Sequence, residues 1–238
     1  MKSFQPVSSP KITDLIVEQI KATILSGELK PSDRLPPERE LVKRFKASRI
    51  AVREALKSLE AAGLVLIKPG SGVFVAEAGS KTMSDSLYSI LRIQNISSHE
   101  VTEARLIFEP HVARLAAERI SAEDLAGLMA NMKKTAAVLK SGSPAVAENI
   151  VFHTLIAEAT HNTVIALTMK TMLEVAREMT PVRPEHMAQR TRVSRYSLTH
   201  HKAIFKALQQ RDPQRVYELM YEHVVRIQRD LKKTMHDT

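Results

Sequence analysis

The segment spanning residues 35–75 constrains the fold of this 238-residue chain more than any other part of the sequence. It begins with two helical patterns, at 38–45 and 48–62, which a two-residue break separates. A glycine ends the second pattern, and two short apolar runs at 65–67 and 73–75 then enclose a turn that contains two glycines. This order predicts a helix-turn-helix followed by a β-hairpin wing, and it makes DNA the first partner to consider.

The predicted helix 48–62 carries its basic residues near its N-terminus and its apolar residues on a different face. Ser48 can cap this helix, and Arg49 and Arg53 lie one turn apart. An arginine at this place can bind a phosphate or the N7 and O6 atoms of guanine. The alternative is a surface salt bridge between either arginine and a neighbouring glutamate. We predict DNA contacts for six residues: Arg39, Ser48, Arg49, Arg53, Lys68 and Gly70.

Charge and composition narrow the class of protein only moderately. The net charge of +9 is spread over both parts of the chain, so by itself it is a weak indication of nucleic acid binding. The absence of cysteine excludes disulfides and leaves nitrogen and oxygen atoms as metal ligands. No apolar run approaches the roughly 18–20 residues that span a bilayer, and the N-terminus lacks the apolar core of a signal peptide. We therefore expect a cytoplasmic protein without a membrane partner.

The pattern of helices and breaks predicts a mainly α-helical protein of two domains. A winged helix-turn-helix domain is expected at 10–76, a linker at 77–82 and an all-helical domain at 83–236. The first domain also contains a helical pattern from Ile12 that Gly27 ends. The helices of the second domain are expected at roughly 83–93, 98–119, 122–140, 144–160, 163–179, 186–210 and 213–234.

Three of the nine histidines lie on the apolar faces of three different predicted helices. They are His153, His201 and His223, and Asn149 precedes His153 by one turn on the same face. A lone histidine of this kind is usually a core residue with one satisfied hydrogen bond. Three of them in a chain without cysteine can instead form a shared site for Zn²⁺ or a similar ion. Both interpretations stay open at this level.

Three ordered motifs in the first domain resemble the DNA-binding domain of GntR-family bacterial regulators: LPPEREL at 35–41, SRIAVREAL at 48–56 and LEAAGL at 59–64. By this resemblance, Arg39, Ser48, Arg49, Arg53 and Gly70 occupy positions that contact operator DNA. The sequence departs from the family at two places. Ile50-Ala51 replaces the commoner Thr-Pro pair, and Pro37 stands where a serine cap is frequent. Because Ile50 cannot donate a hydrogen bond, base recognition then depends more on the two arginines.

The second domain resembles the FCD effector domain of the FadR subgroup of that family. The motifs are NIVFH at 149–153, ATHN at 159–162, HKAI at 201–204 and RDP at 211–213, followed by His223. The resemblance implies a divalent transition metal held by Asn149, His153, His201 and His223, with Zn²⁺ favoured over Ni²⁺ or Mn²⁺. It also implies a small organic acid as effector and places Arg105 among the residues that bind it. The alternative for Arg105 is a pair with Glu109, four residues later.

These features together predict a homodimeric, ligand-responsive transcription regulator and not an enzyme. It would bind a palindromic operator in double-stranded DNA, with repression the commoner response in the family. One alternative is a metal-dependent hydrolase tethered to DNA, in which the histidines activate water. No carboxylate is placed as its general base, because Glu148 and Glu158 lie off the face of His153. The other alternative is a regulator whose metal is purely structural.

Overall fold

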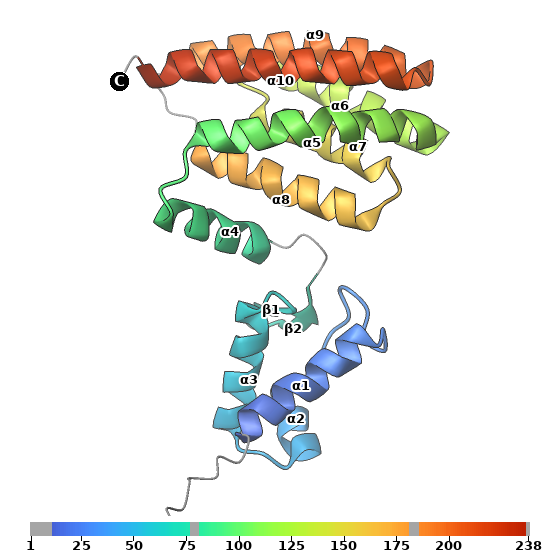
Figure 1. The fold of residues 1–238 in the computed structure, drawn as a ribbon. Helices are drawn as coiled ribbons and strands as arrows, with labels where there is room; N and C mark the ends of the chain where they lie inside the picture. Colours follow the sequence, from blue (N-terminus) through green and yellow to red (C-terminus); the bar gives the residue numbers. More distant parts are fainter. Residues whose placement is uncertain (1–10, 77–80, 181–185, 237–238) are drawn as a thin grey trace, which may run out of the picture. The chain divides into compact units, whose positions relative to one another are not determined.

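The computed structural model describes residues 11–76, 81–180 and 186–236, and the chain divides into two compact units, 1–83 and 84–238 (Figure 1). Most of the expected linker, residues 77–80, lies outside the described residues. Its last two residues, 81 and 82, belong to the helix that follows. Each unit is described by itself below.

The first unit has the order of elements of a winged helix-turn-helix, as predicted. The strands pair antiparallel, with Val65 opposite Val75 and Lys68 opposite Gly72, so the predicted wing is confirmed as a hairpin. Its elements are α1 (Ile12–Leu25), α2 (Glu38–Phe45), α3 (Arg49–Ala61), β1 (Val65–Lys68) and β2 (Gly72–Val75).

Helix α3 is fixed by its cap and by its apolar face. The Ser48 hydroxyl accepts a hydrogen bond from the backbone N–H of Ala51 at 3.1 Å, which confirms the predicted cap. Helix α2 starts after Pro37, which supplies no such side-chain hydrogen bond. The buried apolar residues of the unit form one core: Ile16, Ile20, Leu35, Leu41, Ala51, Val52, Ala55, Leu56, Leu59, Val65 and Val75. The polar start of α3 therefore stays at the surface while its other face is buried.

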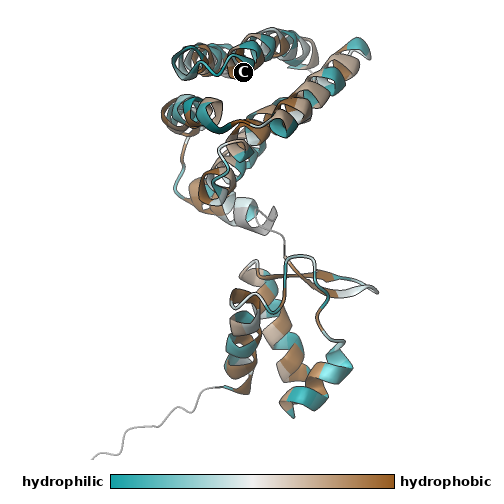
Figure 2. Ribbon diagram, turned by 90° about the vertical axis from the view of Figure 1, so that its right-hand side faces the viewer, coloured by the Kyte–Doolittle hydropathy of each residue, from teal (hydrophilic) through white to brown (hydrophobic). Residues whose placement is uncertain are grey.

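The second unit is a bundle of helices, as predicted (Figure 1). Its helices are α4 (Lys81–Ile93), α5 (Ser98–Arg119), α6 (Ala122–Lys140), α7 (Val146–Glu158), α8 (Thr163–Met179), α9 (Met187–Gln209) and α10 (Pro213–His236). Helix α10 packs against α5 and α9, and α7 packs against α6 and α8. Hydrophobic and hydrophilic residues are interspersed along the helices, as expected where each helix buries only part of its surface (Figure 2).

The helix boundaries of this bundle follow local sequence signals. The Ser121 side chain and the Asp124 carboxylate cap α6 reciprocally, which confirms the capping box that the sequence indicates. A second capping box, formed by Ser97 and Glu100, starts α5. Residues of α5, α7, α8, α9 and α10 surround one region of the interior.

Candidate functional site

The N-terminal part of α3 presents the arginines that the sequence assigns to DNA. Arg49 is exposed and forms no ion pair within the described part of the chain. Arg53 is also exposed, but its Nε atom lies 2.9 Å from Oε2 of Glu38. The alternative of a surface salt bridge is therefore realised for Arg53 and not for Arg49. Both side chains remain accessible to a polyanion, and their contact with DNA stays a prediction.

The wing carries one of the two remaining basic side chains of the predicted surface, and α2 carries the other. The Lys68 ammonium lies 4.8 Å from the centroid of the Phe74 ring, a cation–π contact. Gly70 is exposed at the tip of the hairpin with φ of +73°, a backbone conformation that favours glycine. Arg39 is exposed on α2. The structure thus leaves Arg39, Lys68 and Gly70 at the surface of the unit.

Two further basic residues, Arg34 and Lys57, were not singled out from the sequence. Together with Arg53 and Lys68 they line a groove of about 440 Å³ beside the wing. The Arg34 guanidinium lies so close to Gly72 that a Cβ atom there would approach its Nε to 2.8 Å. Arg34 immediately precedes the 35–41 motif, but no local pattern distinguishes it from other surface arginines.

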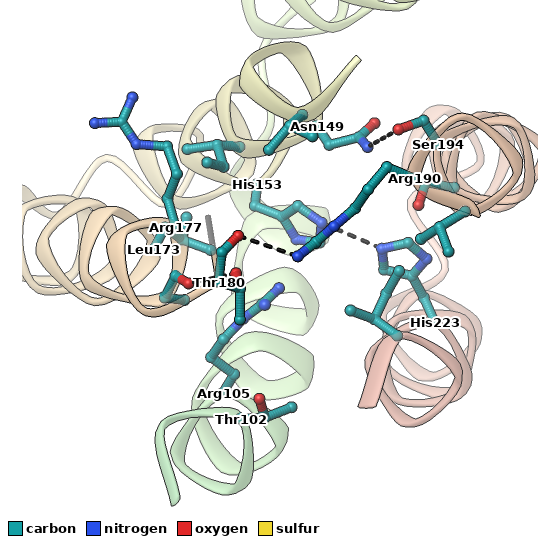
Figure 3. A pocket seen from close by; sticks show the side chains of 16 residues that line it. Thr102, Arg105, Asn149, His153, Leu173, Arg177, Thr180, Arg190, Ser194 and His223 are labelled. Carbon is teal, nitrogen blue, oxygen red and sulfur yellow. Dashed lines mark hydrogen bonds between the residues drawn. The ribbon is translucent and has the colours of Figure 1, made fainter. Parts of the chain in front are cut away.

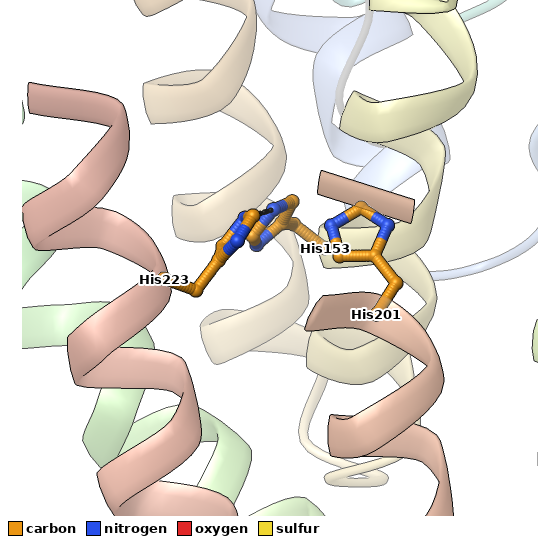
Figure 4. Close-up of side chains that lie close together, drawn as sticks. All are labelled: His153, His201 and His223. Carbon is orange, nitrogen blue, oxygen red and sulfur yellow. Dashed lines mark hydrogen bonds between the residues drawn. The ribbon is translucent and has the colours of Figure 1, made fainter. Parts of the chain in front are cut away.

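The three histidines that the sequence selects converge in the interior of the bundle (Figure 4). His153 comes from α7, His201 from α9 and His223 from α10, and all three are buried. If one ring nitrogen is taken from each histidine, the three atoms all lie within 4.8 Å of one another. The Nε2 atoms of His153 and His223 are 3.2 Å apart. Two imidazole nitrogens on one tetrahedral zinc ion would be about 3.3 Å apart for Zn–N distances near 2.0–2.1 Å.

His201 is the least satisfied member of this cluster. Neither of its ring nitrogens has a hydrogen-bond partner within the described residues, although the side chain is fully buried. Its ring stacks on Phe152 with centroids 3.8 Å apart, which fixes its orientation. Burial, and after it the neighbouring imidazoles, lowers the pKa of His201 well below its ordinary value. A buried neutral imidazole with a free nitrogen lone pair is suited to bind a metal ion.

The carboxylate of Glu109 connects the histidine cluster to Arg105. One oxygen, Oε2, lies 2.5 Å from Nδ1 of His153, and the other, Oε1, lies 2.5 Å from Nε of Arg105. Burial opposes ionisation of this carboxyl, but Arg105 and His153 outweigh it and hold the pKa of Glu109 far below its ordinary value. A proton on Nδ1 of His153 then leaves Nε2 free, which is the usual relation between a metal-binding histidine and its supporting carboxylate.

The sequence does not reveal that the Glu109 carboxylate lies beside His153. Glu109 was considered only as a partner of Arg105, because nothing in the local sequence places it beside a histidine of α7. It is nevertheless not a free general base, since both oxygens are engaged by Arg105 and His153. Glu148, the nearest carboxylate in sequence to Asn149, is directed to Lys134 at 3.3 Å.

Asn149, His153 and His223 border a cavity of about 100 Å³ (Figure 3). The amide nitrogen of Asn149 donates to the Ser194 hydroxyl at 3.4 Å, while its Oδ1 atom is buried without a hydrogen-bond partner among the described residues. This free oxygen is a suitable metal ligand one turn before His153. The cavity is lined by Thr102, Arg105, Val146, Asn149, Ile150, His153, Leu173, Ala176, Arg177, Thr180, Arg190, Val193, Ser194, Ser197, His223 and Ile227.

The residues present fit a divalent metal ion. Three buried imidazoles have close ring nitrogens, an amide oxygen of the same helix face lacks a partner, and a carboxylate supports one of the imidazoles. His200, the neighbour that competes with His201 in the sequence, lies outside this cluster and pairs with the Tyr196 ring at 4.3 Å. The ordinary alternative, a core histidine with one satisfied hydrogen bond, does not describe His201.

Comparison with known proteins identifies both units. Residues 12–75 match the family of bacterial regulatory proteins, gntR family, and residues 100–226 match the FCD domain. The chain therefore belongs to the GntR family, in the subgroup that carries an FCD domain, and it is a DNA-binding transcriptional regulator.

Named relatives and a solved structure agree with this assignment. The chain is 33% identical to the HTH-type transcriptional regulator LutR of Bacillus subtilis, over 65% of this chain and 73% of that protein. It is 27% identical to the HTH-type transcriptional repressor NanR of Klebsiella aerogenes, over 92% of this chain and 85% of that protein. Both are transcriptional regulators and not enzymes, which confirms the expectation against an enzyme.

The solved structure of Streptococcus agalactiae GntR has the same fold. It superposes with a TM-score of 0.72 and 21% identity and covers 91% of this chain and 99% of that chain. At this level of identity the likeness concerns the fold alone. Separately, none of the described helices combines the length and the apolar character that crossing a bilayer requires.

Proposed function

We propose that this regulator is a ligand-responsive repressor, active as a homodimer on a palindromic operator, that senses a small organic acid in the cavity of its FCD domain. The observation that carries the proposal is the buried histidine cluster with unsatisfied nitrogens at the wall of a cavity that arginines also line. The repressor assignment is supported by the printed name of NanR. Two-fold symmetry of a helix-turn-helix dimer matches two half-sites of opposite orientation.

His153, His201, His223 and Asn149 would hold the metal ion, with Zn²⁺ preferred and Ni²⁺ or Mn²⁺ as alternatives for this nitrogen and oxygen donor set. When bound, the metal supplies a Lewis-acid position for an oxygen atom of the effector. Arg105 faces the same cavity with its Nε atom engaged by Glu109. Its remaining N–H groups are available to a carboxylate, so Glu109 orients Arg105 for the effector and His153 for the metal.

Effector binding changes DNA affinity only if the affinity for the effector differs between the DNA-binding and the non-binding states of the protein. The sensing cavity involves five helices, α5, α7, α8, α9 and α10. Each contributes at least one lining residue: Arg105, His153, Leu173, Ser194 and His223. An acid that bridges these helices would favour one packing arrangement of the bundle over another. We propose that this difference is transmitted to the DNA-binding unit.

A thermal-shift screen of small organic acids, with metal-loaded and metal-stripped full-length protein, tests the sensing proposal. A binding acid present at about 100 times its Kd stabilises the folded protein by about 2.7 kcal/mol. We expect at least one acid to raise the melting temperature of the loaded protein and not of the stripped protein. A metal that stabilises the protein while no acid adds a further shift would instead make the metal purely structural.

The DNA side of the proposal predicts a specific effect of Arg49→Ala. Arg49 is exposed at the start of α3 and unpaired among the described residues, whereas Arg53 is engaged by Glu38. A bidentate arginine–guanine contact contributes about 1–3 kcal/mol of discrimination, so Arg49→Ala should weaken specific binding roughly 5- to 150-fold. Fluorescence anisotropy on an operator selected from random DNA measures this.

Lys21→Ala is the control, because it removes a half-buried positive charge of the same unit, on α1, where Lys21 pairs with Glu18 at 3.4 Å. It should leave the ratio of specific to non-specific binding unchanged. Wild-type affinity of Arg49→Ala for the selected operator would contradict the assignment of α3 as the recognition helix. Ile50 is 71% exposed beside Arg49, and it would contact a thymine methyl group if α3 enters the major groove.

A further inference from the structure

Arg190 is a cavity-lining arginine whose charge no carboxylate of the described residues balances. Its Nη2 atom donates to the backbone carbonyl of Thr180 at 3.1 Å, and its Nε atom is buried without a hydrogen-bond partner. A guanidinium has five N–H donors, so one carbonyl satisfies only a small part of its capacity. A partly buried cation with free donors is costly unless an anion completes its surroundings.

The other two arginines that line the cavity, unlike Arg190, are each paired with a carboxylate. Arg105 is paired with Glu109 at 2.5 Å. Arg177 is paired with Glu174 and with Glu178, each at 2.9 Å. Among the arginines that line the cavity, the described residues therefore leave only Arg190 with an unbalanced charge.

The position of Arg190 in the fold explains its positive charge only in part. It lies in the first turn of α9, where the helix dipole disfavours a positive charge. Its hydrogen bond to the Thr180 carbonyl does stabilise the C-terminal end of α8, which ends at Met179. That contact uses one of the five N–H groups, and Nε has no hydrogen-bond partner among the described residues. Figure 3 shows the Arg190 and Arg105 side chains reaching the cavity from different helices.

We propose that the effector is a small acid with two anionic groups, one bound at the histidine and Arg105 side of the cavity and the second bound by Arg190. This inference rests on the proposed sensing function and adds the charge class of the ligand. A carboxylate can form two parallel hydrogen bonds to a guanidinium, which accounts for the free Nε of Arg190. The small cavity, about 100 Å³, favours a short dicarboxylic acid over a long one.

Calorimetric titration of metal-loaded, full-length protein with matched pairs of ligands tests the proposal. Each pair is a dicarboxylate of three to five carbons and its monoamide: malonate and malonamate, succinate and succinamate, glutarate and glutaramate. The monoamide keeps the size and one carboxylate but lacks the second charge. We expect wild-type protein to bind at least one dicarboxylate about tenfold or more tightly than its monoamide, since hydrogen bonds to a charged partner contribute about that factor.

The variants assign this preference to one residue. Arg190→Gln should bind the dicarboxylate and its monoamide equally, because the second charge then has no cationic partner. Arg190→Lys retains the charge and should retain most of the preference, and it serves where the glutamine variant does not fold. Arg192→Gln removes an exposed charge two residues away on α9 and should change nothing.

Three outcomes would overturn the proposal. Equal binding of every dicarboxylate and its monoamide by wild-type protein overturns the two-anion ligand while leaving acid sensing intact. A preference that survives in Arg190→Gln overturns the role of Arg190. If no acid of any kind binds the metal-loaded protein, both the proposed function and this inference fail.

Discussion

Replacing His201 by glutamine should abolish stoichiometric metal binding and the stability that the metal provides. His201 is fully buried, and both of its ring nitrogens lack hydrogen-bond partners within the described residues. The variant removes one of three imidazoles whose ligand atoms lie within 4.8 Å of one another. In wild-type protein, free metal at about 100 times its Kd should add about 2.7 kcal/mol to the free energy of unfolding. In the variant that increment should disappear.

His200→Gln is the matched control, because it removes the adjacent imidazole, which lies outside the cluster. Elemental analysis after purification without chelators gives the metal content, and denaturant unfolding with and without metal gives the stability increment. The triple replacement of His153, His201 and His223 should behave like His201→Gln in both measurements. Stoichiometric metal in the triple variant, or equal stability of stripped and loaded wild-type protein, would make the cluster an ordinary part of the core.

The first unit and the bundle were predictable because their signals are local. The cap at Ser48, the apolar spacing along α3 and the glycines of the wing each act within a few residues. The histidine cluster was predictable for a similar reason. His153, His201 and His223 each lie on the apolar face of their own helix, so each one separately indicates burial. That they meet follows from the packing of α7, α9 and α10 in one bundle.

Helix ends were less predictable where no cap is present. The expected helix 144–160 is observed as α7, Val146–Glu158. Its N-cap residue, Ala145, makes no side-chain hydrogen bond, so the sequence contains no polar signal at that boundary. By contrast α6, which a capping box starts, is found at Ala122–Lys140, the same bounds as the prediction.

The contact of Glu109 with His153 and the place of Arg190 could not be predicted, since they depend on tertiary contacts. Glu109 meets His153 across 44 positions of sequence, and its alternative partner Arg105 is visible as a simple i,i+4 pair. Arg190 belongs to an arginine-rich stretch of α9 that also contains Arg192 and Arg195. Only the fold shows that Arg190 lines the cavity whereas the other two are exposed.

Glu109→Gln should produce the largest loss of stability among single substitutions at this site. The Glu109 side chain is 1% exposed and the Arg105 side chain 11% exposed, so solvent screens their attraction little. Glutamine would leave the Arg105 guanidinium buried without its counter-charge. Removal of one partner of a buried pair costs about 3–5 kcal/mol. Loss of the carboxylate behind His153 should also weaken metal binding about 10- to 100-fold.

The same variant should change how stability depends on pH. In the folded protein the pKa of Glu109 lies below its ordinary value of 4.5, because Arg105 and His153 favour the carboxylate more than burial disfavours it. A depressed pKa contributes stability that is present above the unfolded-state pKa and is lost as pH falls below it. Metal-free wild-type protein should therefore lose stability on acidification below about pH 4.5, and Glu109→Gln should lose less over that interval.

Glu118→Gln tests whether this loss belongs to the buried carboxylate. Glu118 lies on the same helix, α5, but is exposed, so its replacement should change the free energy of unfolding by no more than about 0.5 kcal/mol. Urea unfolding of the three metal-free proteins between pH 7 and pH 3 gives both the size and the pH dependence of the effect. Because Glu109 touches Arg105 on one side and His153 on the other, a substitution without consequence for either stability or metal affinity would contradict its role as the link between the two binding groups.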